Sequence, residues 1–75
     1  MMERAVMDDP LIEVGAKLKA ARMRKNVTQA LLAEASGLSI DTVQRAEKGE
    51  IYPKSLAKMA DALGMKLIIN LGPLE

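Results

Sequence analysis

Four neighbouring side chains near the middle of the chain combine the chemistries that distinguish one base pair from another. They are Ile40, Asp41, Gln44 and Arg45. Arginine can donate two hydrogen bonds to guanine and glutamine can pair with adenine, while a carboxylate can accept from cytosine N4 and an aliphatic group can contact a thymine methyl. In a helix that begins after Ser39, Val43 and Ala46 would face inward and leave these four outside. They are candidate readers of base edges in the major groove of duplex DNA.

Asp41 also has a purely structural interpretation. An acidic residue in the first turn of a helix interacts favourably with the helix dipole, whatever the helix binds. A carboxylate close to phosphates would in addition lower the affinity for DNA while narrowing the choice of sequence. Both roles stay open for Asp41 at this stage.

The residue types that carry most catalytic chemistry are missing. The chain has no histidine and no cysteine, which excludes the usual zinc sites and the common nucleophile and base pairs. It has no glycine-rich phosphate loop, and Asp8 and Asp9 are better explained as the start of a helix. We therefore expect no enzyme activity, no cofactor, no metal and no small-molecule substrate.

Length and composition predict one small domain. With 75 residues the chain buries only about 60% of the surface that its unfolded form exposes. Because it has no disulfide to stabilise the fold, pairing with a second copy is the remaining way to add buried area. No apolar run approaches the ~20 residues of a membrane span, and the residues from Met1 to Asp9 do not fit a signal peptide. A cytoplasmic location with no membrane contact is the default expectation.

The net charge of +1 is uninformative, but its distribution is not. Between Gly15 and Ala33 the chain has five basic residues and no acidic one, namely Lys17, Lys19, Arg22, Arg24 and Lys25. These charges either form the solvated face of an ordinary helix or help to bind an anionic partner.

Apolar periodicity and capping residues predict four helices between residues 11 and 64, preceded by a flexible arm over residues 1–10. The first predicted helix runs from Pro10 to about Lys25 after an Asp9 cap, and the second follows a Thr28 cap and breaks at Ser36-Gly37. The third follows a Ser39 cap and runs to about Glu47, and the fourth starts at Pro53 and is stopped by Gly64. Asn26 and Gly37 can adopt the left-handed conformation that ends a helix. The second and third helices, separated by a tight turn at Gly37, have the outline of a helix-turn-helix.

The segment that outlines the helix-turn-helix resembles the Cro-type phage-repressor, or xre, family. The matching residues are Thr28-Gln29-x-x-Leu32-Ala33-x-x-x-Gly37-Leu38-Ser39-x-x-Thr42-Val43-x-Arg45-x-Glu47-x-Gly49, with Val14-Gly15-x-x-Leu18-x-x-x-Arg22 upstream. The resemblance implies an all-α, lambda-repressor-like domain over residues 11–64 and a sequence-specific, DNA-binding transcriptional regulator. Its helix 39–47 would lie in the major groove.

The resemblance also implies roles for individual residues. It assigns base reading to the four positions named above, phosphate binding to Gln29, and a partly buried scaffold salt bridge to Arg22 and Glu47. Further candidates for phosphate contact are Thr28, Ser39, Thr42 and Lys48. Two departures stand out: Ala46 replaces a bulkier family residue, and the short connection before Pro53 leaves Tyr52 to be placed. We expect Tyr52 to lie over the core, with a phosphate contact as the alternative.

The last segment, residues 65–75, changes to a period of two. Up to Leu71 it has Met65, Leu67, Ile69 and Leu71 on one side and Ile68 on the other, and Gly72-Pro73 ends the run. A strand without a neighbour leaves its backbone groups unsatisfied, so the simplest partner is the same strand of a second copy. The tail is similar to that of HipB-like antitoxins, which implies a homodimer that reads an inverted repeat. The alternative is an apolar flap folded back on one protomer.

Three functions follow from these patterns. The first is a homodimeric repressor, and the second is an antitoxin that binds a toxin protein and represses its own operon. The third, from a different class, is a protein–protein interaction module that has lost DNA reading. The low net charge and Asp41 favour the third.

Overall fold

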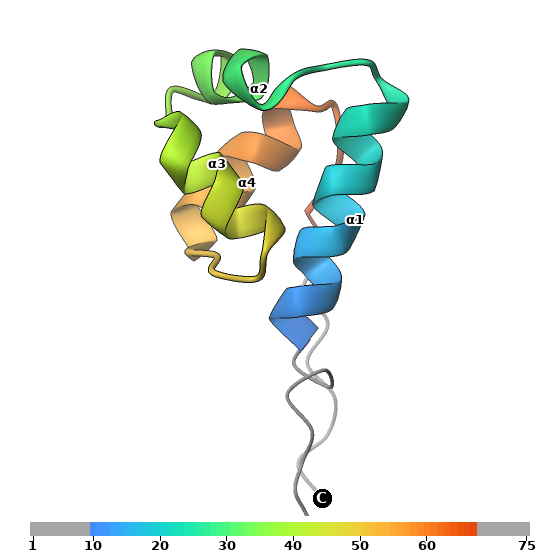
Figure 1. The fold of residues 1–75 in the computed structure, drawn as a ribbon, viewed down its shortest axis with the longest axis vertical. Coiled ribbons are helices and arrows are strands. Elements are labelled where there is room, and N and C mark those ends of the chain that lie inside the picture. The colour runs from blue at the N-terminus through green and yellow to red at the C-terminus, as the bar shows by residue number, and fades with distance from the viewer. Residues whose placement is uncertain (1–9, 68–75) are drawn as a thin grey trace, which may run out of the picture.

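The computed structural model of the chain describes residues 10–67, which fold into four helices (Figure 1). The helices are α1 (Pro10–Arg24), α2 (Gln29–Ser36), α3 (Ile40–Glu47) and α4 (Pro53–Ala62). This confirms the predicted all-α fold with the helix-turn-helix in the second and third helices. The end of α1 differs from the prediction by one residue, within the usual margin for helix ends.

The turn between α2 and α3 is held by local hydrogen bonds that the sequence encodes. Thr28 caps α2, with its Oγ1 accepting from the backbone N–H of Leu31 at 3.0 Å. Gly37 ends α2 with φ +72°, and the N–H of Leu38 donates to the carbonyl of Ala33 at 2.9 Å. Because a positive φ is costly for residues with a Cβ, glycine suits this turn. The predicted Thr28 cap and the left-handed Gly37 are both confirmed.

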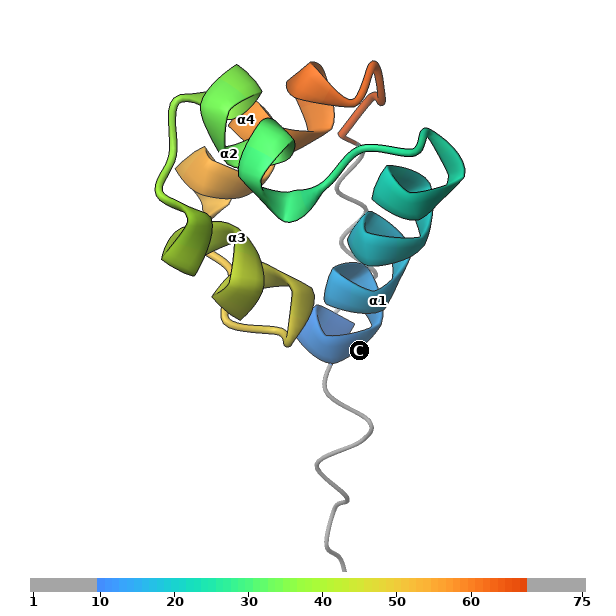
Figure 2. The same ribbon diagram turned by 45° about the horizontal axis from the view of Figure 1, so that its top comes forward.

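The core lies where the four helices meet (Figure 2). α2 packs against both α3 and α4, and α1 packs against α3. The buried apolar residues are Leu18, Ala21, Leu32, Ala33, Val43, Ala46, Met59, Ala60 and Leu63. The chain has no Phe or Trp, and among residues 10–67 the largest fully buried side chains are those of Leu32, Met59 and Val43.

α1 approaches the end of α3 closely at Gly15. A Cβ built on Gly15 would lie 2.5 Å from the carbonyl oxygen of Ala46 and 2.9 Å from that of Glu47. Both obstacles are backbone atoms, so a side chain at position 15 could not be accommodated without moving one helix. Gly15 therefore sets the distance between α1 and the helix that carries the candidate base readers.

The expectation that Tyr52 covers the core is wrong. Tyr52 is 69% exposed and precedes α4 with an extended backbone, φ −102° and ψ 141°. Side chains of successive extended residues point to opposite sides. Ile51 packs against the core, and Tyr52 therefore points to solvent.

The predicted dimerisation strand falls mostly outside the described residues. After α4, Met65, Lys66 and Leu67 have no regular secondary structure in this single chain, and Met65 and Leu67 are each 39% exposed. Ile68, Ile69 and Leu71 lie outside the described residues, as does residue range 1–9 with the predicted Asp9 cap. The strand and its pairing across a two-fold axis stay predictions. Within residues 10–67, no helix combines the length and apolar character needed to cross a membrane.

Candidate DNA-binding surface

The outer face of α3 carries the four candidate base readers. Val43 and Ala46 are buried, at 0% and 1% exposure, and they fix which side of α3 faces the core. Ile40, Asp41, Gln44 and Arg45 are all exposed. Ile40 is 45% exposed although it is a large apolar residue, as a contact to a thymine methyl would require.

Asp41 and Arg45 form an ion pair along α3. The Nε of Arg45 lies 3.0 Å from Oδ2 of Asp41, and the two side chains are 61% and 65% exposed. An exposed pair four residues apart in a helix contributes only about 0.3–0.5 kcal/mol, so it does little for stability. It does restrict Arg45, because the ion pair keeps the guanidinium group close to Asp41.

The hydroxyl groups at the two helix starts have structural partners and can still donate a hydrogen bond. Ser39 caps α3 by accepting from the N–H of Thr42 at 3.1 Å, and the two hydroxyl oxygens lie 2.8 Å apart. Thr28 has the same capping role in α2. A hydroxyl that accepts at a cap keeps its own hydrogen, so Thr28 can cap α2 and donate to a phosphate. In the Ser39–Thr42 pair one hydroxyl donates to the other, which leaves one hydrogen of the pair for a phosphate.

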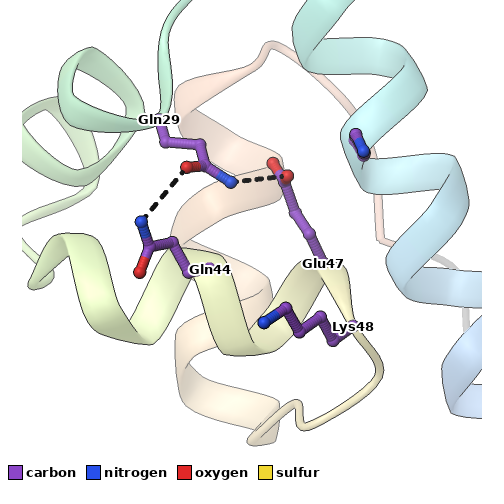
Figure 3. A pocket seen from close by; sticks show the side chains of 5 residues that line it. Gln29, Gln44, Glu47 and Lys48 are labelled. Carbon is purple, nitrogen blue, oxygen red and sulfur yellow. Dashed lines mark hydrogen bonds between the residues drawn. The ribbon is translucent and has the colours of Figure 1, made fainter.

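A chain of hydrogen-bonded polar side chains runs from Arg22 of α1 to the outer face of α3. Figure 3 shows the part that joins Glu47, Gln29 and Gln44. Arg22 donates to both carboxylate oxygens of Glu47, from Nε at 2.6 Å and from Nη2 at 3.2 Å, and also from Nη1 to the carbonyl of Val27 at 2.8 Å. Gln29 donates from Nε2 to Oε1 of Glu47 at 3.0 Å. Gln44 then donates to Oε1 of Gln29 over a longer distance, 3.4 Å.

Glu47 determines the orientation of both amides in this chain. A carboxylate can only accept hydrogen bonds, so Gln29 must turn its amino group toward Glu47 and its oxygen toward Gln44. Gln44 must in turn offer an N–H to Gln29. The side-chain oxygen and the second N–H of Gln44 stay available for another partner. One donor and one acceptor are the pair that adenine requires in the major groove.

The Arg22–Glu47 pair expected from the resemblance is present and is nearly buried, with side-chain exposures of 11% and 4%. Gln29, expected to bind a phosphate, is only half-buried and spans Glu47 and Gln44. The sequence did not reveal this link, because its members lie 15 and 18 positions apart in the chain.

Comparison with known proteins agrees with this arrangement. The family model of the helix-turn-helix domain matches residues 13–67. The chain belongs to the helix-turn-helix domain family. Membership supports a role in DNA binding and transcription regulation, because such domains place their second helix in the major groove.

A curated relative of this helix-turn-helix domain is multiprotein-bridging factor 1c from Arabidopsis thaliana. The two are 38% identical over an alignment of 72 residues, which covers 93% of this chain and 49% of the relative. The chain thus spans about half the length of that protein.

The helix-turn-helix domain has a polar hollow beside its reading face. It has a volume of about 330 Å³ and is lined by Lys19, Gln29, Gln44, Glu47 and Lys48. From the sequence, Lys48 was a candidate for phosphate contact. Lys19 was one of five basic residues that could form a solvated helix face or bind an anionic partner. The signal for Lys19 was its position one helical turn after Gly15 and three residues before Arg22, the two α1 residues that face the end of α3. Within residues 10–67, no cluster of three or more His, Cys, Asp or Glu residues could hold a metal ion.

Proposed function

We propose that this chain is a sequence-specific, double-stranded DNA-binding regulator that inserts α3 into the major groove. The observation that carries the proposal is the exposed row Ile40, Asp41, Gln44 and Arg45, presented by a helix whose opposite face is buried. An α-helix fits the major groove, where each base pair offers a distinct pattern of donors and acceptors. The protein would act in the cytoplasm, without a cofactor and without catalysis.

Arg45 and Gln44 are the proposed sources of specificity. Arg45 would donate to guanine with its guanidinium group, which is exposed on the outer face of α3 beside Asp41. Gln44 would pair with adenine, since its outward donor and acceptor are already oriented by Gln29. Thr28, Ser39 and other polar groups at the two helix starts would bind phosphates and fix the register of α3 on the duplex.

The finer form of the proposal is a homodimeric repressor. Its support is the exposed Met65 and Leu67 at the start of the predicted strand. Two such domains would read half-sites about 34 Å apart in an inverted repeat. The antitoxin alternative has the same DNA-binding role, with a toxin protein as an additional partner. It rests on the resemblance alone.

A protein–protein interaction module is the second candidate function. It is favoured by the name of the Arabidopsis thaliana relative, a multiprotein-bridging factor, of which the chain covers about half. It is also favoured by Asp41, a carboxylate on the face that would approach phosphates.

Selection of bound sequences from a pool of random duplexes tests the proposal. The wild type should enrich a common sequence, and Arg45→Ala and Gln44→Ala should each relax the preference at one position by about 1–3 kcal/mol. Arg24→Ala is the matched control, because it removes an exposed arginine from α1, away from α3. It should leave the preferred sequence unchanged.

Two results would speak against the proposal. If Arg45→Ala and Gln44→Ala enriched the same sequence as the wild type, the residue assignments would be wrong. If the wild type failed to bind any duplex even at low salt, the interaction module would replace the DNA-binding regulator as the better account.

A further inference from the structure

The hollow between α1, α2 and α3 brings two lysines together from distant parts of the chain. Lys19 belongs to α1 and Lys48 is the residue that follows α3, and both are exposed. Figure 3 shows Lys48 running back along α3 beside Gln44 and Glu47. The hollow is therefore lined on two sides by ammonium groups.

The positive charge of the hollow is not cancelled by its only acidic member. Glu47 is paired with Arg22 through two hydrogen bonds, so its charge is already compensated. Among residues 10–67, neither Lys19 nor Lys48 forms an ion pair. Two lysines without a partner around one open hollow favour an anion as the ligand.

Gln29 adds a directed donor to the same hollow. Its amino group has two hydrogens, of which one is used on Glu47. The orientation of that amide is fixed, because its oxygen accepts from Gln44. The second hydrogen is available to an anion that sits between the lysines, and no side-chain rearrangement is needed to present it.

The hollow also lies where a duplex would pass. Gln44 belongs both to the hollow and to the outer face of α3, and Lys48 follows it by one helical turn on that face. If Gln44 reads a base edge, the sugar-phosphate backbone beside that groove crosses the hollow.

We propose that this hollow binds one backbone phosphate of the duplex, held jointly by Lys19, Lys48 and the amide of Gln29. The inference rests on the proposed function and adds Lys19 of α1 to the DNA-binding surface. A single phosphate between α1 and the end of α3 fixes the angle at which α3 enters the groove. The ligand is a phosphodiester anion, and the test distinguishes it from free phosphate.

The first test measures how binding to the selected duplex depends on salt. Lys19→Gln and Lys48→Gln should each reduce the slope of log K against log salt by up to about 0.9 per bound protomer. The advantage of the wild type over Lys19→Gln should then shrink about 3.5-fold between 50 and 200 mM salt. The double variant should lose less than the sum of the single variants, because both lysines hold the same phosphate. Lys19→Arg keeps the charge and should restore the slope.

Lys17→Gln is the matched control. Lys17 has the same charge on the same helix, but two residues along an α-helix turn through about 200°, so Lys17 points away from the hollow. It should leave the slope nearly unchanged. Thermal melts should give all lysine variants the stability of the wild type, since both lysines are exposed.

The second test replaces one phosphate at a time in the duplex by an uncharged methylphosphonate. The wild type should weaken at one linkage in each half-site, and Lys19→Gln should weaken less at that linkage, because the variant holds the phosphate only through Lys48 and Gln29. Titration with inorganic phosphate covers the other source of the anion. If free phosphate bound at Lys19 and Lys48 while no linkage depended on Lys19, the hollow would be a site for a free anion and the proposal would fail.

The remaining outcomes separate this inference from the proposed function. If the wild type bound duplex but Lys19→Gln behaved like Lys17→Gln in salt and at every linkage, the inference would be overturned and the DNA-binding role would stand. If the wild type bound no duplex, both would fall together.

Discussion

Replacing Gly15 by alanine tests how closely α1 must approach α3. The added Cβ would lie 2.5 Å and 2.9 Å from two backbone oxygens, whereas ordinary contacts begin near 3.4 Å. The nearest oxygen must therefore retreat by about 0.9 Å. Because neither obstacle is a flexible side chain, the cost belongs near the upper end of the 1–3 kcal/mol typical of overpacking, about 3 kcal/mol.

A second effect of the same substitution has the opposite sign. Alanine is favoured over glycine in a helix interior by about 1 kcal/mol. The net loss should therefore be about 2 kcal/mol, which lowers the Tm of a domain of this size by roughly 8–16 °C. Displacing α1 also moves Arg22 away from Glu47, so DNA affinity should fall together with stability.

Denaturant or thermal unfolding measures both effects when Ala16→Gly is included. Ala16 is exposed in the same helix, so this control isolates the helix propensity and should cost about 1 kcal/mol. A Gly15→Ala variant as stable as the wild type, or more stable, would refute the close approach of the two helices.

Two further predictions concern charged residues of α3. Glu47→Ala should destabilise the fold by about 3–5 kcal/mol, because it leaves a nearly buried arginine without its carboxylate partner. Urea unfolding measures this loss of stability. A loss under about 1 kcal/mol would contradict the burial of the pair. Asp41→Asn should leave stability within about 0.5 kcal/mol, because its ion pair with Arg45 is exposed. It should also raise DNA affinity by removing a carboxylate from the reading face, and Asp61→Asn, an exposed substitution in α4, controls for net charge. Equal effects of the two asparagine variants in a binding titration would argue against Asp41 at the DNA.

The parts of the fold that were predictable from the sequence depend on local chemistry. A capping hydroxyl acts on an N–H three positions away, and a left-handed glycine acts on its own backbone, so Thr28, Ser39 and Gly37 could be assigned from the sequence. The burial of Val43 and Ala46 followed from helical periodicity. These local features sufficed to orient the outer face of α3.

The parts that were not predictable depend on contacts between residues that lie far apart in the chain. The phosphate role expected for Gln29 stays a prediction, but its bonds to Glu47 and Gln44 were not foreseen, because only the packing of α2 on α3 brings these residues within reach. Tyr52 was expected to lie over the core, but the extended backbone before α4 turns it outward. Lys19 lines a hollow formed between three helices, and the sequence did not show that these helices meet there.

The most direct measurement of the central claim combines a change in the groove with a change in the protein. In the selected duplex, 7-deazaguanine removes the N7 acceptor of a guanine from the major groove and leaves the minor groove intact. One such replacement in each half-site should weaken the wild type by about 1 kcal/mol or more and should leave Arg45→Ala unaffected. If no replacement weakened the wild type, or if both proteins lost the same affinity, α3 would not read the major groove through Arg45.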